Sequence, residues 1–211
     1  MPFEVRHMGS KYPIFSFDFT GAKRGVLPAS YDYLRLEGRM QYRLNLPPIG
    51  YSQLMLEGGK IFGKVPYLLL KLHEGNGTYF YDRYAFSCMN FYEFSSDAWI
   101  SFFYEHHFNG FLLGRVPLLK KLNWREVFVF KGVYGTLSAR NDGSLPNTKA
   151  VMLFPVGMSS VEHPYLETGF GIENIFRLLR VDCIWRLTHH RAVPGLSIPT
   201  FTVNFSLNLK F

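Results

Sequence analysis

The sequence has few cysteines and few charged residues for its length. Only Cys88 and Cys183 occur among 211 residues, too few for a disulfide framework or a zinc site. Charged residues make up 18%, below the roughly 25% of an average soluble domain. No apolar run approaches the roughly 18 residues of a transmembrane helix, and the longest, around 65–72, is interrupted by Pro66 and Lys71. With a mean hydropathy of −0.01, the chain is neither a helical membrane protein nor disordered.

Motifs for catalysis and metal binding are also missing. There is no Gly-Lys-Ser/Thr phosphate loop, and no serine, histidine and aspartate stand in the context of a nucleophile. Neighbouring residues on a strand face opposite ways, so neither His106–His107 nor His189–His190 can chelate as a pair. The net charge is +7, but the lysines and arginines alternate with apolar residues instead of forming a patch. This distribution argues against a nucleic-acid partner. We predict a non-enzymatic protein without cofactor, metal or nucleic-acid partner.

Aromatic residues, in contrast, are abundant. They form 18% of the chain, with 21 phenylalanines and 13 tyrosines. The final stretch FTVNFSLNLKF, residues 201–211, alternates strictly between apolar and polar, which predicts a strand with two unlike faces. At roughly 3.3 Å per residue and a tilt near 45°, this strand covers about 25 Å, the apolar band of an outer-membrane barrel. The stretch YLRLEGRMQYRLNL, residues 33–46, has the same alternation.

The same reading along the chain predicts one antiparallel β-domain over residues 1–211. Long and short connections alternate between its strands, with one exception around PLLKKL, as in outer-membrane barrels, which have long extracellular loops and short periplasmic turns. Counting back from a periplasmic C-terminus places the connections 21–32, 60–88, 138–163 and 189–199 outside. The predicted strands are 12–20, 33–46, 49–59, 89–109, 125–137, 164–172, 180–188 and 201–211.

Periodicity does not tell which face of the strands is inside. A membrane barrel places polar residues inside, whereas a soluble barrel places them outside. Strand length, the aromatic excess and the long polar loops favour the membrane barrel. The alternatives are a soluble β-barrel or sandwich that binds an apolar ligand, and an outer-membrane enzyme that depends on Glu105 or His107. In the membrane barrel, the charged side chains predicted to face the lumen are Arg35, Glu37, Arg39, Arg43, Glu105, Glu167, Arg180, Asp182 and Arg186.

Several stretches resemble known outer-membrane barrels. YLETGFGI, ENIFRL, LRVDCIWRL and the final strand ending in Phe resemble the end of BamA-like insertase and transporter barrels. LEGGKIFG resembles the approach to the large inward-folding loop of that superfamily. More closely, GGKIFGKVPYLLLKLHEGN, MNFYEFSSD, EHHFNGF and PYLETGFGIENIFRLLRVD resemble a Bacteroidota family. In that family a carboxypeptidase-regulatory-like domain precedes a large barrel of unassigned function.

The resemblance covers about residues 10–211 and implies the C-terminal half of a roughly sixteen-stranded transmembrane β-barrel in the bacterial outer membrane. It implies a role in envelope biogenesis or transport, contact with outer-membrane lipid, and recognition of Phe211 by the assembly machinery. Insertases carry an Arg-Gly-aromatic tip in the large loop, but the loop here reads HEGNGTYFYDRYAF, where only Arg83 can stand in. We therefore expect no insertase mechanism of the usual kind, and Asp82 and Arg83 as the structured part of the inward loop.

Overall fold

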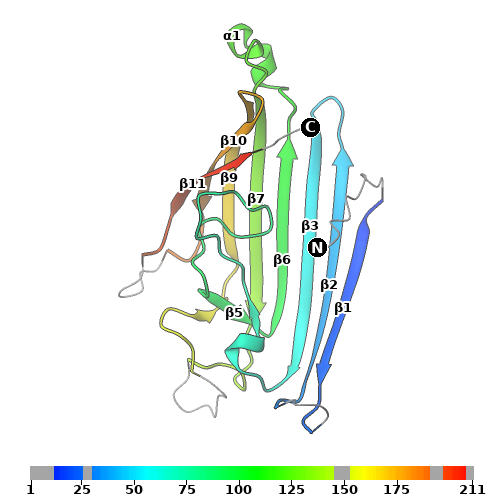
Figure 1. Cartoon of the computed structure of the whole chain (residues 1–211), viewed down its shortest axis with the longest axis vertical. Helices are drawn as coiled ribbons and strands as arrows, with labels where there is room; N and C mark the ends of the chain where they lie inside the picture. The colour runs from blue at the N-terminus through cyan, green and yellow to red at the C-terminus, as the bar shows by residue number, and fades with distance from the viewer. Residues whose placement is uncertain (1–11, 26–29, 145–152, 191–196, 208–211) are drawn as a thin grey trace.

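An open antiparallel sheet of eight strands dominates the structure (Figure 1). The structure is a computed structural model that describes residues 12–25, 30–144, 153–190 and 197–207. The strands follow the order β1–β2–β3–β6–β7–β9–β10–β11, so every neighbour in the sheet is also a neighbour along the chain within this set. Their bounds are β1 Ile14–Ala22, β2 Tyr33–Asn45, β3 Tyr51–Gly63, β6 Ala98–His107, β7 Arg125–Thr136, β9 Tyr165–Ile175, β10 Leu179–Arg186 and β11 Phe201–Leu207. The predicted all-β, antiparallel class is confirmed.

One predicted strand, 89–109, was wrong in its first half. Tyr92 takes a left-handed backbone conformation with φ of 58°, and residues 89–93 form no strand. The next residues form β5 (Phe94–Ser96), which pairs with β4 (Lys71–Leu72) and with β8 (Ser159–Ser160) in a small separate sheet. Because β3 runs on to Gly63, the connection between β3 and β6 spans residues 64–97, which we call the inward segment.

The short β2–β3 and β9–β10 turns lie at one end of the sheet, and the long β3–β6 and β7–β9 connections lie at the other (Figure 1). Residues 46–50 join β2 to β3, where Gly50 has a φ of 108°. A Cβ on Gly50 would lie 1.8 Å from the His107 carbonyl oxygen, so only glycine fits this turn. The β6–β7 connection at the same end contains the 3-10 turn η2 (Leu113–Arg115) and the short helix α1 (Pro117–Lys120). The 3-10 turn η1 (Tyr67–Leu69) belongs to the inward segment at the other end.

The two faces of the sheet differ in polarity. On β10, for example, Arg180, Asp182 and Arg186 are buried on the concave face, whereas Trp185 is 41% exposed on the convex face. The other charged residues buried on the concave face are Glu57, Glu105, Lys131, Glu167 and Glu173. The large apolar side chains exposed on the convex face include Phe15, Phe17, Phe19, Leu34, Phe62, Ile100, Tyr134, Phe170, Phe201, Phe205 and Leu207.

The inward segment packs against the concave face and forms the apolar core with it. Phe86, Met89 and Phe94 of the segment are buried with side chains of the sheet. The sheet and the β7–β9 connection contribute Met55, Phe103, Val133, Val161 and Tyr165 to this cluster. A second cluster contains Ile61, Val65, Leu70 and Trp99. The core therefore lies between the sheet and the segment that it encloses.

Strands β1 and β11 form the two edges of the sheet, and they do not pair with each other in the described part of the chain. The outer edge of β11 is covered at one point by the inward segment. The Tyr81 N–H donates to the Phe205 carbonyl at 2.8 Å, and the Phe205 N–H donates to the Tyr79 carbonyl at 2.7 Å. Within the described residues, no helix is long and apolar enough to cross a membrane. Residues 208–211, which include Phe211, lie outside the described residues.

Candidate functional site

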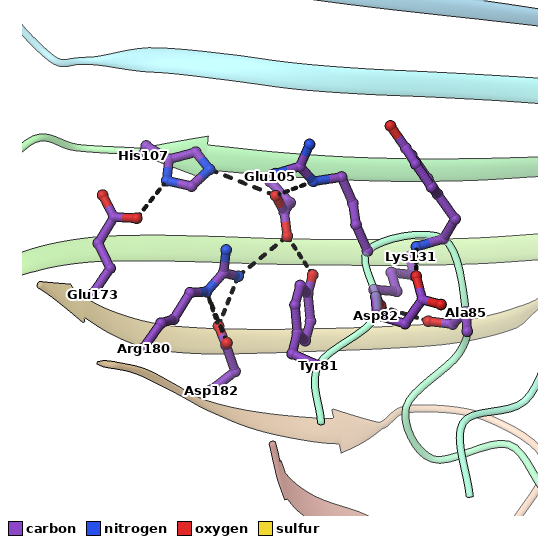
Figure 2. Close-up of polar contacts among 11 residues, drawn as sticks. Tyr81, Asp82, Ala85, Glu105, His107, Lys131, Glu173, Arg180 and Asp182 are labelled. Carbon is purple, nitrogen blue, oxygen red and sulfur yellow. Dashed lines mark hydrogen bonds and ion pairs between the residues drawn. The ribbon is translucent and has the colours of Figure 1, made fainter. Parts of the chain in front are cut away.

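The buried carboxylate of Glu105 on β6 is the centre of one network on the concave face. Arg83 donates from Nε to Glu105 Oε2 at 2.8 Å, and the Tyr81 hydroxyl donates to Glu105 Oε1. Arg180 on β10 donates from Nη2 to Oε1 at 3.1 Å. Figure 2 shows Tyr81, Arg180 and His107 converging on this carboxylate. A single carboxylate on the wall of the sheet thus holds two side chains of the inward segment.

The network continues from Glu105 along β6 to β9. His107 Nε2 lies 3.5 Å from Glu105 Oε2, and its Nδ1 lies 3.1 Å from Glu173 Oε2. The imidazole is also stacked on the Tyr51 ring, with centroids 4.5 Å apart. A histidine held between two carboxylates and an aromatic ring is fixed in orientation, and it keeps Glu105 and Glu173 apart.

Two cations of the wall lie against the Tyr81 ring. The Arg180 guanidinium is 4.4 Å and the Lys131 ammonium 4.5 Å from its centroid. Arg180 is paired with Asp182 at 2.8 Å, so its charge is balanced on its own strand. Cations over an aromatic face contribute about 0.5–2 kcal/mol each when desolvated. Tyr81 is therefore held through its hydroxyl by Glu105 and through its ring by Arg180 and Lys131.

Lys131 on β7 binds the backbone of the inward segment. Its Nζ donates to the carbonyl of Asp82 at 2.8 Å and to that of Ala85 at 2.6 Å. These carbonyls do not belong to any strand, and a buried carbonyl without a partner is costly. The lysine therefore supplies the hydrogen-bond donors that a neighbouring strand would otherwise provide. The Asp82 carboxylate accepts the Tyr84 N–H at 2.8 Å, which stabilises the local turn.

Glu167 on β9 is the corresponding acceptor for backbone donors. It accepts the N–H of Ser87 at 2.8 Å, that of Cys88 at 2.7 Å and the Tyr165 hydroxyl at 2.6 Å. Burial and the nearby Glu167 carboxylate raise the pKa of the Cys88 thiol to about 12. Arg186 on β10 donates to the Cys88 carbonyl at 3.1 Å and pairs with Glu93 at 2.5 Å. Residues 87–93 are thus held from both β9 and β10.

Glu57 on β3 holds the start of the inward segment. Its carboxylate pairs with Lys71 at 2.6 Å and with Arg39 at 2.7 Å. Trp99 Nε1 donates to the same group at 3.3 Å. Glu57 therefore binds one cation of the sheet, Arg39 on β2, and one cation of the inward segment, Lys71.

The remaining predicted lumen charges, Arg35, Glu37 and Arg43, lie on β2. Glu37 Oε1 lies 3.9 Å from Lys71 Nζ at the start of the inward segment. Arg35 pairs with Glu37 at 2.6 Å and lies over the Trp99 ring at 5.2 Å. Arg43 is exposed and stacks on Tyr51 at 4.1 Å. These residues border the concave face without binding the tip of the segment.

The structure brings together some of the predicted residues in one network and separates others. Glu105, Arg83, Arg180 and Asp182 form one cluster, whereas Glu167 and Arg186 form a second one. Sequence analysis missed the wall residues Glu57 and Lys131 and the segment residues Lys71, Tyr81 and Glu93. Glu57 and Lys131 have a detectable signal, because both fall in the polar set of an alternating strand.

Both clusters share one chemical feature, which is that charged side chains of the sheet bind parts of the inward segment that lie outside its short strands β4 and β5. Carboxylates of the sheet accept hydrogen bonds from N–H groups of the segment and pair with its cations. Cations of the sheet donate hydrogen bonds to carbonyls of the segment. Residues 3–139 match the C-terminal domain of DUF5686, a family of unknown function. The chain belongs to the DUF5686 family. A search of the curated proteins gave no match.

The matched part of the DUF5686 domain contains β1 to β7 and the whole inward segment. The partners of that segment on β9 and β10, such as Glu167 and Arg180, lie beyond residue 139. Glu105, Lys131 and Arg83 lie within the match, so the centre of the network is part of the family's domain.

Proposed function

We propose that the chain belongs to a non-enzymatic β-barrel protein of the bacterial outer membrane that acts in envelope biogenesis or transport. The concave face of the sheet would line the lumen, and the inward segment would fill part of it. The observation that carries this proposal is the polarity of the sheet, with charges buried on the concave face and aromatic and aliphatic side chains exposed on the convex face.

A soluble protein with this polarity would be difficult to keep in solution. Soluble monomers rarely expose contiguous apolar patches of more than a few hundred Å², yet exposed apolar side chains here recur from β1 through β11. In lipid the same face is favourable, because outer-membrane barrels carry an apolar band outside and polar residues inside. The soluble barrel considered above would have the opposite polarity. The polarity therefore favours a lipid-facing sheet.

We further propose that the domain is the C-terminal part of a barrel of about sixteen strands related to the BamA-like barrels. The open edges β1 and β11 support additional strands. The inward segment after Gly58–Gly59 supports the relation, since it folds onto the concave face. A Cβ on Gly59 would lie 2.5 Å from the Trp99 indole, so the absence of a side chain at Gly59 leaves room for the Trp99 ring next to β3.

Lipid of the outer membrane would cover the convex face. The assembly machinery remains the proposed partner for Phe211, which lies outside the described residues. Arg83 takes part in a structural contact with Glu105, and the segment lacks the Arg-Gly-aromatic tip. We therefore favour a passive or transport-linked lumen over the insertase mechanism.

Single-tryptophan variants test which face meets lipid. Trp185 is 41% exposed on the convex face, whereas Trp99 is 5% exposed on the concave face. In liposomes of brominated phosphatidylcholine, a variant that keeps only Trp185 should be strongly quenched relative to ordinary lipid. The matched variant that keeps only Trp99 should not be quenched. Equal quenching of the two, or quenching of Trp185 by aqueous acrylamide alone, would contradict a lipid-facing convex surface.

A further inference from the structure

A cavity of about 320 Å³ lies on the concave face at the end of the sheet that carries the short turns. It is enclosed by Arg83 of the inward segment, Arg125 at the start of β7, and Arg177 and Arg180 of the β9–β10 hairpin. A second cavity of about 650 Å³ shares Arg125 and Arg177 and adds Lys120 of α1. Four arginines and one carboxylate, Glu173, line the first cavity.

The arginines of this cavity are not equally neutralised. Arg83 and Arg180 are paired with Glu105 and Asp182, as described above. Glu173 is paired with His107. Within the described residues, no ion pair or side-chain hydrogen bond involves Arg125 or Arg177. Arg125 lies opposite Glu173 in the β7–β9 pairing and interacts with it electrostatically. Because Glu173 is the single carboxylate in the lining of the first cavity and is also paired with His107, it offsets Arg125 and Arg177 only in part, and the boundary between the two cavities keeps net positive charge.

Such a site is suited to an anion of a particular kind. Concave sites lined by one sign of charge focus the electrostatic potential, and guanidinium groups bind phosphate through two parallel hydrogen bonds. Tyr51, Asn174 and Ser206 add neutral hydrogen-bonding groups to the lining. The volume is in the range of small-molecule sites, roughly 300–1,000 Å³.

We propose that this cavity binds a phosphate group, with Arg125 and Arg177 as its principal ligands. The phosphate belongs to a soluble diphosphate or phosphate ester, or to the headgroup of an anionic lipid. The site depends on the charges of the concave face and not on whether the convex face meets lipid. A failure of the quenching experiment would therefore not contradict the phosphate site. Likewise, absence of phosphate binding would not contradict the lipid-facing convex surface.

Calorimetric titration of the full-length protein in a neutral detergent tests the site, with pyrophosphate as the probe at low ionic strength. The double variant Arg125→Gln/Arg177→Gln should bind pyrophosphate at least about tenfold more weakly, because it loses two cations and the charge-assisted hydrogen bonds that they donate to phosphate. Arg115→Gln is the matched control, since Arg115 is exposed at the same end of the sheet and does not line the cavity. It should bind like the wild type.

A second arm separates the two sources of phosphate. The same variants are reconstituted with phosphatidylglycerol or with phosphatidylcholine, and retained lipid is quantified after extensive detergent exchange. Retention of phosphatidylglycerol by the wild type and its loss in the double variant would assign the site to a lipid headgroup. Pyrophosphate binding without such retention would assign it to a soluble ligand. If neither probe binds, or if the folded double variant binds both like the wild type, the proposal is wrong.

Discussion

At the scale of single residues, Glu105 has more partners than any other carboxylate described here that faces the inward segment. Arg83, Arg180, the Tyr81 hydroxyl and His107 all approach its two oxygens. Removing one member of a buried ion pair costs about 3–5 kcal/mol, because the remaining charge stays buried without compensation. The network is therefore sensitive to the loss of this one group.

Glu105→Gln should loosen the inward segment without changing the size of the side chain. Alkylation of Cys88 in a Cys183→Ser background measures this, because the Cys88 thiol is 0% exposed and burial raises its pKa to about 12. A loss of about 3 kcal/mol would raise the open population, and hence the alkylation rate, roughly a hundredfold. Glu74→Gln is the control, since Glu74 is on the same segment but its side chain is 64% exposed. Equal rates in the two variants would show that Glu105 does not hold the segment.

His73 provides a pH-dependent contribution at the start of the segment. It is buried and its Nε2 lies 2.9 Å from Ser96 Oγ. Burial, helped by the neighbouring Lys71 ammonium, lowers the pKa of His73 from 6.5 to about 3. Because the unfolded state then binds the proton more strongly, stability from this group is present above pH 6.5 and is lost as the pH falls toward 3.

Between pH 7 and pH 5 this group should lower the free energy of unfolding by about 2 kcal/mol. His73→Gln should remove that part of the pH dependence, whereas His163→Gln, at an exposed position, should leave it in place. Denaturant titrations at the two pH values measure the difference. An identical slope in wild type and His73→Gln would contradict a neutral buried His73.

At the scale of elements, strands were predictable where one face of the sheet is buried and the other is not. The stretch 180–188 alternates in sequence, and β10 (Leu179–Arg186) alternates in burial, because successive side chains point to opposite faces. The inward segment gave no such pattern. Phe94, Ser95 and Ser96 are all buried, so periodicity could not separate β5 from β6.

The contacts of the candidate site were harder to predict than its residues. Lys131 binds the carbonyls of Asp82 and Ala85, and Glu167 binds the N–H groups of Ser87 and Cys88. Backbone groups leave no mark in the amino-acid sequence, because every residue other than proline has both of them. Alternation could identify the charged wall side chains, but it could not identify which part of the chain they hold.

Whether the convex face of the sheet meets lipid can be tested on the β9–β10 hairpin, with the same substitution at two positions. Phe170, at the middle of β9, is 60% exposed on the convex face, and Phe176, in the β9–β10 turn, is 86% exposed. In a lipid-facing sheet Phe170→Arg should cost about 2–4 kcal/mol, and Phe176→Arg, near the interface, about 0–1 kcal/mol. Unfolding by denaturant in liposomes, followed by tryptophan fluorescence, measures both. In a water-exposed sheet both changes should stay within about 0.5 kcal/mol, which would contradict the proposal.

At the scale of the whole molecule, the two edge strands of the sheet differ in how far their backbone hydrogen-bonding groups are paired. The inward segment covers part of the β11 edge through Phe205. For β1, no comparable partner on its outer edge occurs among the described residues, and Phe15, Phe17 and Phe19 are exposed beside it. Unpaired N–H and C=O groups cost several kcal/mol each in lipid and invite edge-to-edge association in water. The β1 edge therefore requires a partner strand.

From these edges we expect residues 1–211, expressed alone, to aggregate or to give no heat-modifiable monomer on a gel after refolding in detergent. If the proposed larger barrel is correct, a longer protein that supplies further strands next to β1 should give such a band, because closure satisfies every edge group. In a Cys88→Ser/Cys183→Ser background, cysteines at Phe17 and Val203 provide the decisive readout, since these positions lie on the two edge strands. The native cysteines are removed because Cys183 lies directly opposite Val203. A monodisperse monomer of residues 1–211 with a disulfide between them would show that eight strands close on themselves, and the larger barrel would then be wrong. Failure of this disulfide to form, together with aggregation, is the expected outcome, because the sheet as described remains open between β1 and β11.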